Sequence, residues 1–136
     1  MSRLAPIIAL AASFLALAGC GKGSNLIEVE GTVTVNGQPL ADGDISFFPA
    51  DPQYGGEGGK IKDGKYRLKA RPGKNKVEIR ATREVAGKKM PSAAGPDAPA
   101  DAVFESYLPK QYNEETTLEA DVGAGKTNFP FELKVP

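Results

Sequence analysis

Apolar and polar residues alternate with a period of two along most of the chain after residue 26. In the segment IEVEGTVTV, Val29 and Val33 share one parity, whereas Glu28 and Glu30 share the other. Side chains of a β-strand point to opposite faces in turn, so this pattern predicts a strand with one buried and one solvated face.

The same alternation recurs in five further segments, and a short glycine-led segment, GGKIK, adds another strand. Asn36-Gly37, Asp63-Gly64 and Pro72-Gly73 predict turns between strands, because glycine tolerates the positive φ that tight turns need. Pro130 falls on the outward face of the last strand, which predicts an edge strand. The predicted inward residues of these segments are Ile45, Phe47, Tyr66, Leu68, Ala70, Val77, Ile79, Ala81, Leu118, Ala120, Val122, Phe129, Phe131, Leu133 and Val135.

Seven strands without a long helix predict an all-β domain. Two sheets that are apolar on one face must cover one another, so the expected architecture is a seven-stranded antiparallel β-sandwich over residues 26–136. The inward set is large enough for a stable core, and we expect the domain to fold as a monomer without a disulfide or a metal.

Residues 84–115 interrupt the alternation. They include four prolines and few large apolar residues, which predicts a long Pro/Ala-rich loop with a mobile first half at 87–98. The spacing of Val103, Phe104, Tyr107 and Leu108 fits one face of a helix, so DAVFESYL is expected to form one or two helical turns. Tyr107 and Tyr112 are expected to pin this loop to the domain.

The N-terminal segment, MSRLAPIIALAASFLALAGC, has one charge at Arg3, then an uncharged stretch over 4–18, then small residues. This layout is typical of a cleaved secretory signal peptide. The apolar run of about 15 residues is shorter than the roughly 20 that a membrane-spanning helix needs.

Leu17-Ala18-Gly19-Cys20 closes that run and resembles the bacterial lipobox, whose cysteine is acylated and becomes the new N-terminus. We therefore expect residues 1–19 to be removed, Cys20 to carry lipid, and residues 20–25 to form a short tether. As the only cysteine, Cys20 cannot form an intrachain disulfide. The protein is expected to be exported and anchored in a bacterial membrane, facing the periplasm or the cell surface. By resemblance to enterobacterial sorting rules, Gly21 favours the outer membrane.

Two longer stretches, VEGTVTVNGQPLADGDISFFPAD and GKIKDGKYRLKARPGKNKVEI, are similar to the carboxypeptidase regulatory-like domain. The lipobox, LPKQYN and FPFEL together resemble small lipoproteins abundant in planctomycetes. The resemblance implies a transthyretin-type Greek-key sandwich and brings no catalytic activity or ligand. The matching motif positions are Gly31, Val33, Gly37, Pro39, Leu40, Asp63, Gly64, Tyr66, Leu68, Pro72, Gly73 and Val77.

The residue inventory narrows the possible chemistry. The chain has no histidine and a single cysteine, which excludes Ser-His-Asp and Cys-His nucleophile systems and zinc sites built on these residues. Acidic residues in turns are typically solvated. This applies to the pairs Asp42/Asp44 and Glu114/Glu115 and to the loop residues Asp51 and Glu57. We expect no enzymatic activity, cofactor or metal. Equal numbers of basic and acidic residues argue against a nucleic-acid partner.

The near-zero net charge hides a basic sector. Residues 60–89 hold 12 lysines and arginines against three acidic residues. If the strands on either side of Pro72-Gly73 pair, their outward cations form one basic face for anionic envelope polymer or lipid head groups. Alternatively, neighbouring strands that carry Glu28, Glu30, Glu119 and Asp121 neutralise those cations. The cations of the predicted face are Lys65, Arg67, Lys69, Lys76 and Arg80.

These observations predict a non-catalytic, lipid-anchored protein of the cell envelope. Its β-sandwich would serve as a binding or structural module, attached to the membrane through N-terminal acyl chains. The alternative is a small-molecule or ion carrier with a pocket near the 84–115 loop.

Overall fold

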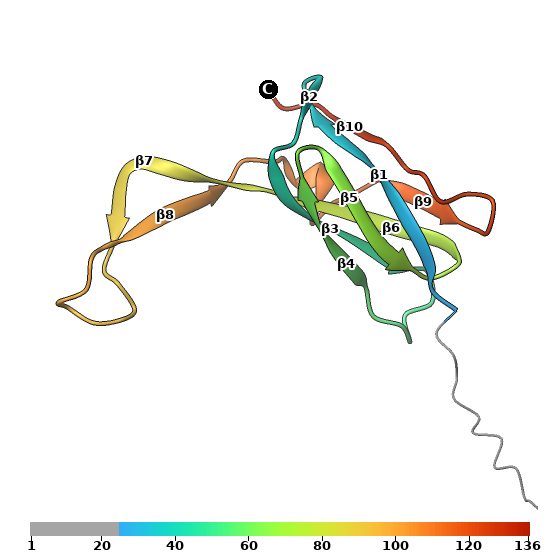
Figure 1. Ribbon diagram of the computed structural model, residues 1–136, viewed down its shortest axis with the longest axis horizontal. Coiled ribbons are helices and arrows are strands. Elements are labelled where there is room, and N and C mark those ends of the chain that lie inside the picture. The colour runs from blue at the N-terminus through green and yellow to red at the C-terminus, as the bar shows by residue number, and fades with distance from the viewer. Residues whose placement is uncertain (1–24) are drawn as a thin grey trace, which may run out of the picture.

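Ten strands and one short 3-10 turn make up residues 25–136, the part of the chain that the computed structural model describes (Figure 1). The predicted all-β class is confirmed, and no helix within these residues is long and apolar enough to cross a membrane. The lipobox and Cys20 lie outside the described residues. The elements are β1 (Ile27–Val35), β2 (Gln38–Pro39), β3 (Asp42–Pro49), β4 (Glu57–Lys62), β5 (Lys65–Ala70), β6 (Gly73–Arg80), β7 (Thr82–Met90), β8 (Asp101–Ser106), η1 (Lys110–Tyr112), β9 (Glu119–Val122) and β10 (Phe131–Leu133).

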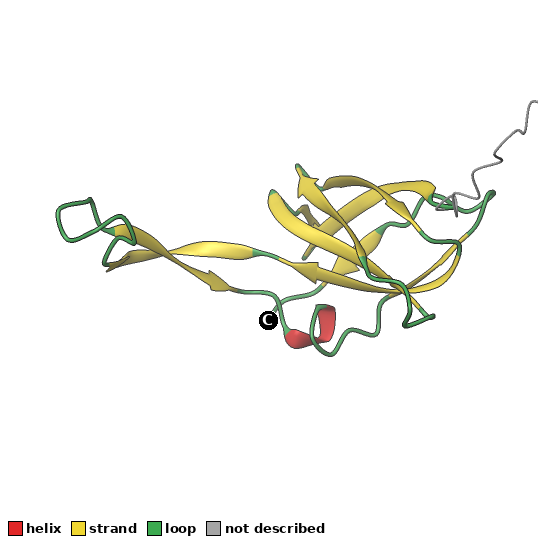
Figure 2. Cartoon of the chain, turned by 90° about the horizontal axis from the view of Figure 1, so that it is seen from below, coloured by secondary structure: helices red, strands yellow, loops and turns green. Residues whose placement is uncertain are grey.

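The main sheet has the order β10-β1-β5-β4-β3-β6-β9, with β2 added beside β1. Its neighbouring strands are antiparallel, except that β10 runs parallel to the second half of β1. The sheet curls into a half-barrel, and β10 is an edge strand as Pro130 predicted (Figure 2).

The concave side of the half-barrel holds the core, and the predicted alternation decides which residues enter it. Ile45, Phe47, Val77 and Ile79 are fully buried. The ring of Phe47 lies 6.2 Å from that of Tyr66 and 6.5 Å from that of Phe131, measured between ring centres, so aromatic residues of three strands meet. Within residues 25–136, the buried apolar residues lie between Val29 and Leu133.

Strand β10 approaches β1 closely because position 31 is a glycine. A Cβ built at Gly31 would lie 2.1 Å from the carbonyl oxygen of Phe129, which no side chain tolerates. The hydroxyl of Tyr66 donates a hydrogen bond of 2.7 Å to the same carbonyl oxygen of Phe129. Gly31 and Tyr66 thus act together to fix the segment that precedes β10.

The structure corrects the prediction for residues 84–115. Strands β7 and β8 form an antiparallel hairpin that projects away from the half-barrel (Figures 1 and 2). The predicted helical turns at 101–108 are wrong, because residues 101–106 pair with β7 instead and Phe104 is 61% exposed rather than packed on the core.

The segment after this hairpin returns to the domain, as expected. Leu108 is buried, and Tyr107 packs against the core. The hydroxyl of Tyr112 donates to the carbonyl of Lys134 (3.0 Å) and accepts from its N–H (2.8 Å). The predicted pinning role of these tyrosines is therefore confirmed.

Candidate functional site

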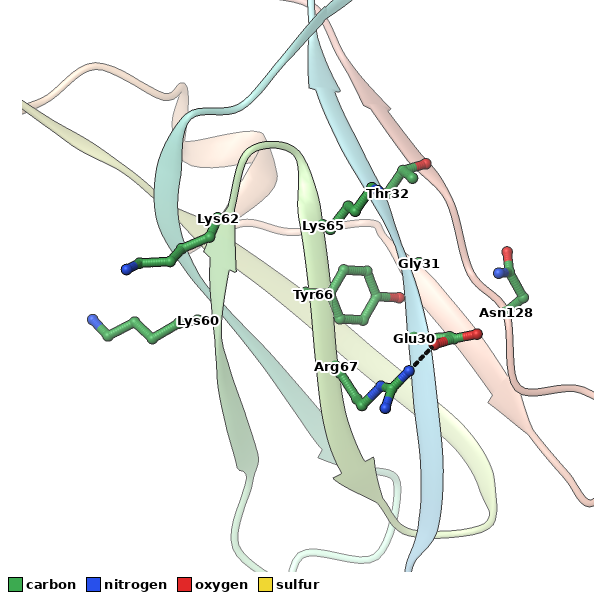
Figure 3. Close-up of a pocket in the computed structure, with 9 residues that line it drawn as sticks. All are labelled: Glu30, Gly31, Thr32, Lys60, Lys62, Lys65, Tyr66, Arg67 and Asn128. Carbon is green, nitrogen blue, oxygen red and sulfur yellow. Dashed lines mark hydrogen bonds and ion pairs between the residues drawn. The ribbon is translucent and has the colours of Figure 1, made fainter.

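An open hollow of about 620 Å³ lies over β1, β4 and β5 (Figure 3). Four cationic side chains line it, Lys60 and Lys62 from β4 and Lys65 and Arg67 from β5, against one acidic residue, Glu30 from β1. We call this feature the basic hollow. Its lining carries a net positive charge, although the chain as a whole is neutral.

The β4–β5 turn places two of these cations at opposed positions of the backbone, and their side chains extend in different directions from it (Figure 3). Asp63 and Gly64 have φ of 51° and 73°, which makes a two-residue hairpin turn of the type that Asp-Gly favours. Such a turn fixes the register of its strands, and Lys62 is the direct partner of Lys65. Like charges at directly opposed positions repel one another.

The outward cations of β5 differ in what lies across from them on β1. Lys69 is opposite Glu28, and Arg67 is opposite Glu30. The guanidinium of Arg67 is 2.9 Å from the Glu30 carboxylate and 3.5 Å from that of Glu28. The hydrogen bond to Glu30, and then the charges of both acids, raise the pKa of Arg67.

Lys65, by contrast, is opposite Thr32, which carries no charge. It forms no ion pair within residues 25–136. Of the three outward cations of β5, only Lys65 is therefore opposite a β1 residue that carries no negative charge.

On β4, Lys60 and Lys62 also differ. Lys60 forms a 2.6 Å ion pair with Asp44, and this contact raises the pKa of Lys60. Lys62 is the register partner of Asp42 on β3, yet the described structure contains no ion pair between them. Lys62 and Lys65 therefore form a like-charge pair whose charges remain available to a ligand.

Tyr66 lies beneath the hollow, between β5 and β1, with its ring turned into the core (Figure 3). Burial raises the pKa of its hydroxyl, which is already hydrogen-bonded to Phe129. The side chain is therefore a neutral structural group. The hydroxyl of Thr32 and the amide of Asn128 add polar groups to the rim.

The predicted basic face does not form as one surface. Strands β5 and β6 are separated by β4 and β3 instead of pairing through the Pro72-Gly73 turn. On β6, Lys76 is opposite Glu119, and Arg80 lies 3.1 Å from Glu78. The structure thus brings Lys65, Arg67 and Lys69 together but places Lys76 and Arg80 elsewhere.

Register confirms the alternative that acidic strands flank the basic ones. Glu28 and Glu30 face β5, whereas Glu119 and Asp121 face β6. Sequence reasoning missed Lys60 and Lys62. The Asp-Gly turn was the signal that could have found Lys62, because it places the residues on either side of it in direct opposition.

Three of the acidic residues considered from the sequence are engaged in local contacts. Asp44 pairs with Lys60, Glu114 lies 3.7 Å from Lys110, and Asp51 accepts two hydrogen bonds from Gln53. Within residues 25–136 no three His, Cys, Asp or Glu side chains gather as they would around a metal ion.

Comparisons with known proteins assign no family. No family model and no curated protein matches the chain. A 9R-lipoxygenase from Cyanothece PCC8801 is similar in structure with a TM-score of 0.37 and 13% identity, over 82% of this chain and 16% of that chain. A likeness of this degree carries no argument about this chain's fold or activity.

Proposed function

We propose that this protein is a non-catalytic, lipid-anchored protein of the cell envelope whose β-domain binds an anionic polymer at the basic hollow. The lipobox at residues 17–20 supports the anchor. We also infer that the curled sheet is a form of the transthyretin-type β-sandwich; the support is the motif resemblance, whose turn glycines Gly37, Gly64 and Gly73 all have the positive φ that tight turns require.

The observation that carries the binding function is the opposed pair of Lys62 and Lys65. Neither lysine has an ion pair within residues 25–136, whereas the neighbouring Lys60 and Arg67 already have acidic partners, so both charges are open to an anionic ligand that spans the turn. The free energy of that contact is lost as salt rises, because the hollow is open to solvent.

The openness of the hollow favours a polymer over a small ligand. Each exposed ion pair contributes only about 0.2–1 kcal/mol. A chain that carries many carboxylates presents them to this hollow at high local concentration, so another carboxylate can rebind when one leaves. An acidic polysaccharide fits this requirement, and the Thr32 and Asn128 side chains offer hydrogen-bond partners for its hydroxyl groups.

The test uses polygalacturonate as the probe and the unacylated chain from residue 20 with Cys20→Ser. Replacing both Lys62 and Lys65 by Gln should weaken binding at low salt by about tenfold, the loss expected for two exposed charge contacts. The control replaces Lys69 and Lys76 by Gln, which removes the same charge from positions opposite Glu28 and Glu119.

Equal losses in the two double variants would contradict the proposal, since they would mean that only net charge matters. The anchor has a separate test in cells. Cys20→Ser should abolish the acyl mass and release the protein from the detergent phase; an unchanged mass and partitioning would contradict lipid attachment.

A further inference from the structure

Arg71, in the connection between β5 and β6, stacks on Tyr54 of the β3–β4 loop. The guanidinium carbon lies 3.8 Å from the centre of the tyrosine ring. An adjacent hollow of about 360 Å³ is lined by both residues and by Asn25, Asp51 and Lys74. Stacking on an aromatic ring orients the planar guanidinium before any ligand arrives.

The hydrogen-bond donors of Arg71 are not used within residues 25–136. Its Nε is buried without a partner, and the described chain contains no ion pair to its guanidinium. A buried N–H without an acceptor is costly, and it leaves the terminal amino groups of the guanidinium as the donors that a ligand in the hollow would meet. The planar guanidinium presents paired donors that match a phosphate or carboxylate.

The backbone around Arg71 is held in place from the core side. Asn75 is fully buried, and its side-chain amide donates hydrogen bonds of 2.9 Å to the carbonyls of Arg71 and Gly73. Arg71 is therefore fixed by its backbone on one side and by the ring of Tyr54 on the other. This is the rigidity that a specific anion site requires.

The charges near Arg71 permit an anion. The carboxylate of Asp51 accepts hydrogen bonds of 3.1 and 2.7 Å from Gln53 and keeps its negative charge, so Arg71 and Lys74 leave the lining with one net positive charge. Lys74 supplies a second cation, and its ammonium lies 3.9 Å from Glu119.

The position of this site indicates which anion it meets. Asn25, the first described residue, lines the same hollow, and Cys20 precedes it by only five residues. An extended segment of that length reaches at most about 18 Å. If Cys20 is acylated, as the proposed function requires, this hollow is held within that distance of the membrane surface.

We propose that Arg71, stacked on Tyr54, binds the phosphate of a phospholipid head group. The contact would set the orientation of the domain on the membrane. The start of β1 and the β4–β5 turn lie at opposite ends of the sheet (Figure 1). Docking through Arg71 therefore points the Lys62–Lys65 end, with the basic hollow, away from the bilayer.

The test measures partitioning of the unacylated chain, from residue 20 with Cys20→Ser, onto phosphatidylglycerol-containing vesicles at low salt. Arg71→Gln should weaken partitioning about fivefold, the effect of one cation near an anionic surface. Arg83→Gln is the matched control, because Arg83 also lies near a tyrosine ring, 5.6 Å from Tyr107, but on the projecting hairpin. It should leave partitioning unchanged.

Two further measurements identify the contact. Tyr54→Ala should reduce partitioning, whereas Tyr54→Phe, which keeps the ring, should not. The Nε–H resonance of Arg71 should shift on addition of short-chain phosphatidylglycerol and respond far less to the same concentration of inorganic phosphate.

Equal losses for Arg71→Gln and Arg83→Gln would overturn the proposal, as would an equal response to inorganic phosphate. Circular dichroism of each variant excludes unfolding as the cause. Because the chain tested carries no lipid, these results do not depend on acylation, and a failure of the anchor in cells remains distinguishable from a failure of this site.

Discussion

The half-barrel and the β7–β8 hairpin are both built from antiparallel strands, yet they are stabilised differently. In β3 and β6, alternate side chains are fully buried. In β7, no residue is fully buried, and in β8 Phe104 faces solvent. The hairpin relies on its backbone ladder and on exposed ion pairs such as Arg83–Glu105 at 2.9 Å. Burial holds the half-barrel, whereas only local pairing holds the hairpin.

This difference explains which strands the sequence could predict. All seven predicted strands are present, because each contributes apolar or small residues of one parity to the core. The sequence did not predict strands β2, β7 and β8. None of them buries a complete face, so their sequences need not alternate between apolar and polar residues. The residues that fitted one helical face do not share an environment, because Phe104 is exposed on β8 whereas Leu108 is buried in the core.

Strand order was less predictable than strand position. Strands joined by a tight turn usually pair, which favoured β5 beside β6. In the structure β5 is already paired on both sides, with β1 and with β4. The pairing of β1 with β5 joins residues about 40 positions apart, and no local pattern encodes such contacts. The basic hollow depends on this order, which is why sequence analysis found only part of it.

The largest expected effect contrasts a phenylalanine of each region. Phe47→Ala removes a fully buried ring that contacts the rings of Tyr66, Phe129 and Phe131, and should cost about 3–5 kcal/mol of unfolding free energy. Phe104→Ala in the hairpin removes a ring that is 61% exposed and should cost less than about 0.5 kcal/mol.

Urea denaturation of the two variants measures the contrast directly. Comparable losses for both would mean that the hairpin contributes a buried face in solution, and the distinction between the regions would fail.

An intermediate effect concerns Tyr66 and alkaline pH. Burial raises the pKa of Tyr66 above the ordinary tyrosine value of about 10. The unfolded chain therefore loses this proton at lower pH than the folded protein, so the contribution of Tyr66 to stability should be fully present below about pH 10 and be lost as the pH rises above it. Tyr66→Phe should remove this contribution to the alkaline loss. It should also cost about 1–2 kcal/mol at neutral pH, because the Phe129 carbonyl loses its 2.7 Å hydrogen bond.

Denaturation midpoints between pH 7 and 12 test this prediction. Tyr54→Phe is the matched control, since Tyr54 is 41% exposed and lies in a loop. A Tyr66→Phe profile as steep as that of the unmodified protein would show that other groups cause the alkaline loss.

The smallest expected effect follows removal of the hairpin. Thr82 and Ser106 are direct register partners, so an Asn-Gly turn can join them in place of residues 83–105. Those residues contribute no side chain to the buried core, and an isolated two-stranded hairpin is marginally stable in water. A shorter connection also lowers the entropy cost of loop closure, which acts in the stabilising direction. The unfolding free energy should therefore fall by no more than about 1 kcal/mol.

In the intact protein, amides of β7 and β8 should exchange with solvent faster than those of β3 and β6, because the hairpin can open without disturbing the core. A loss of several kcal/mol on removal, or equal protection of the two regions, would show that the hairpin and the half-barrel unfold as one unit.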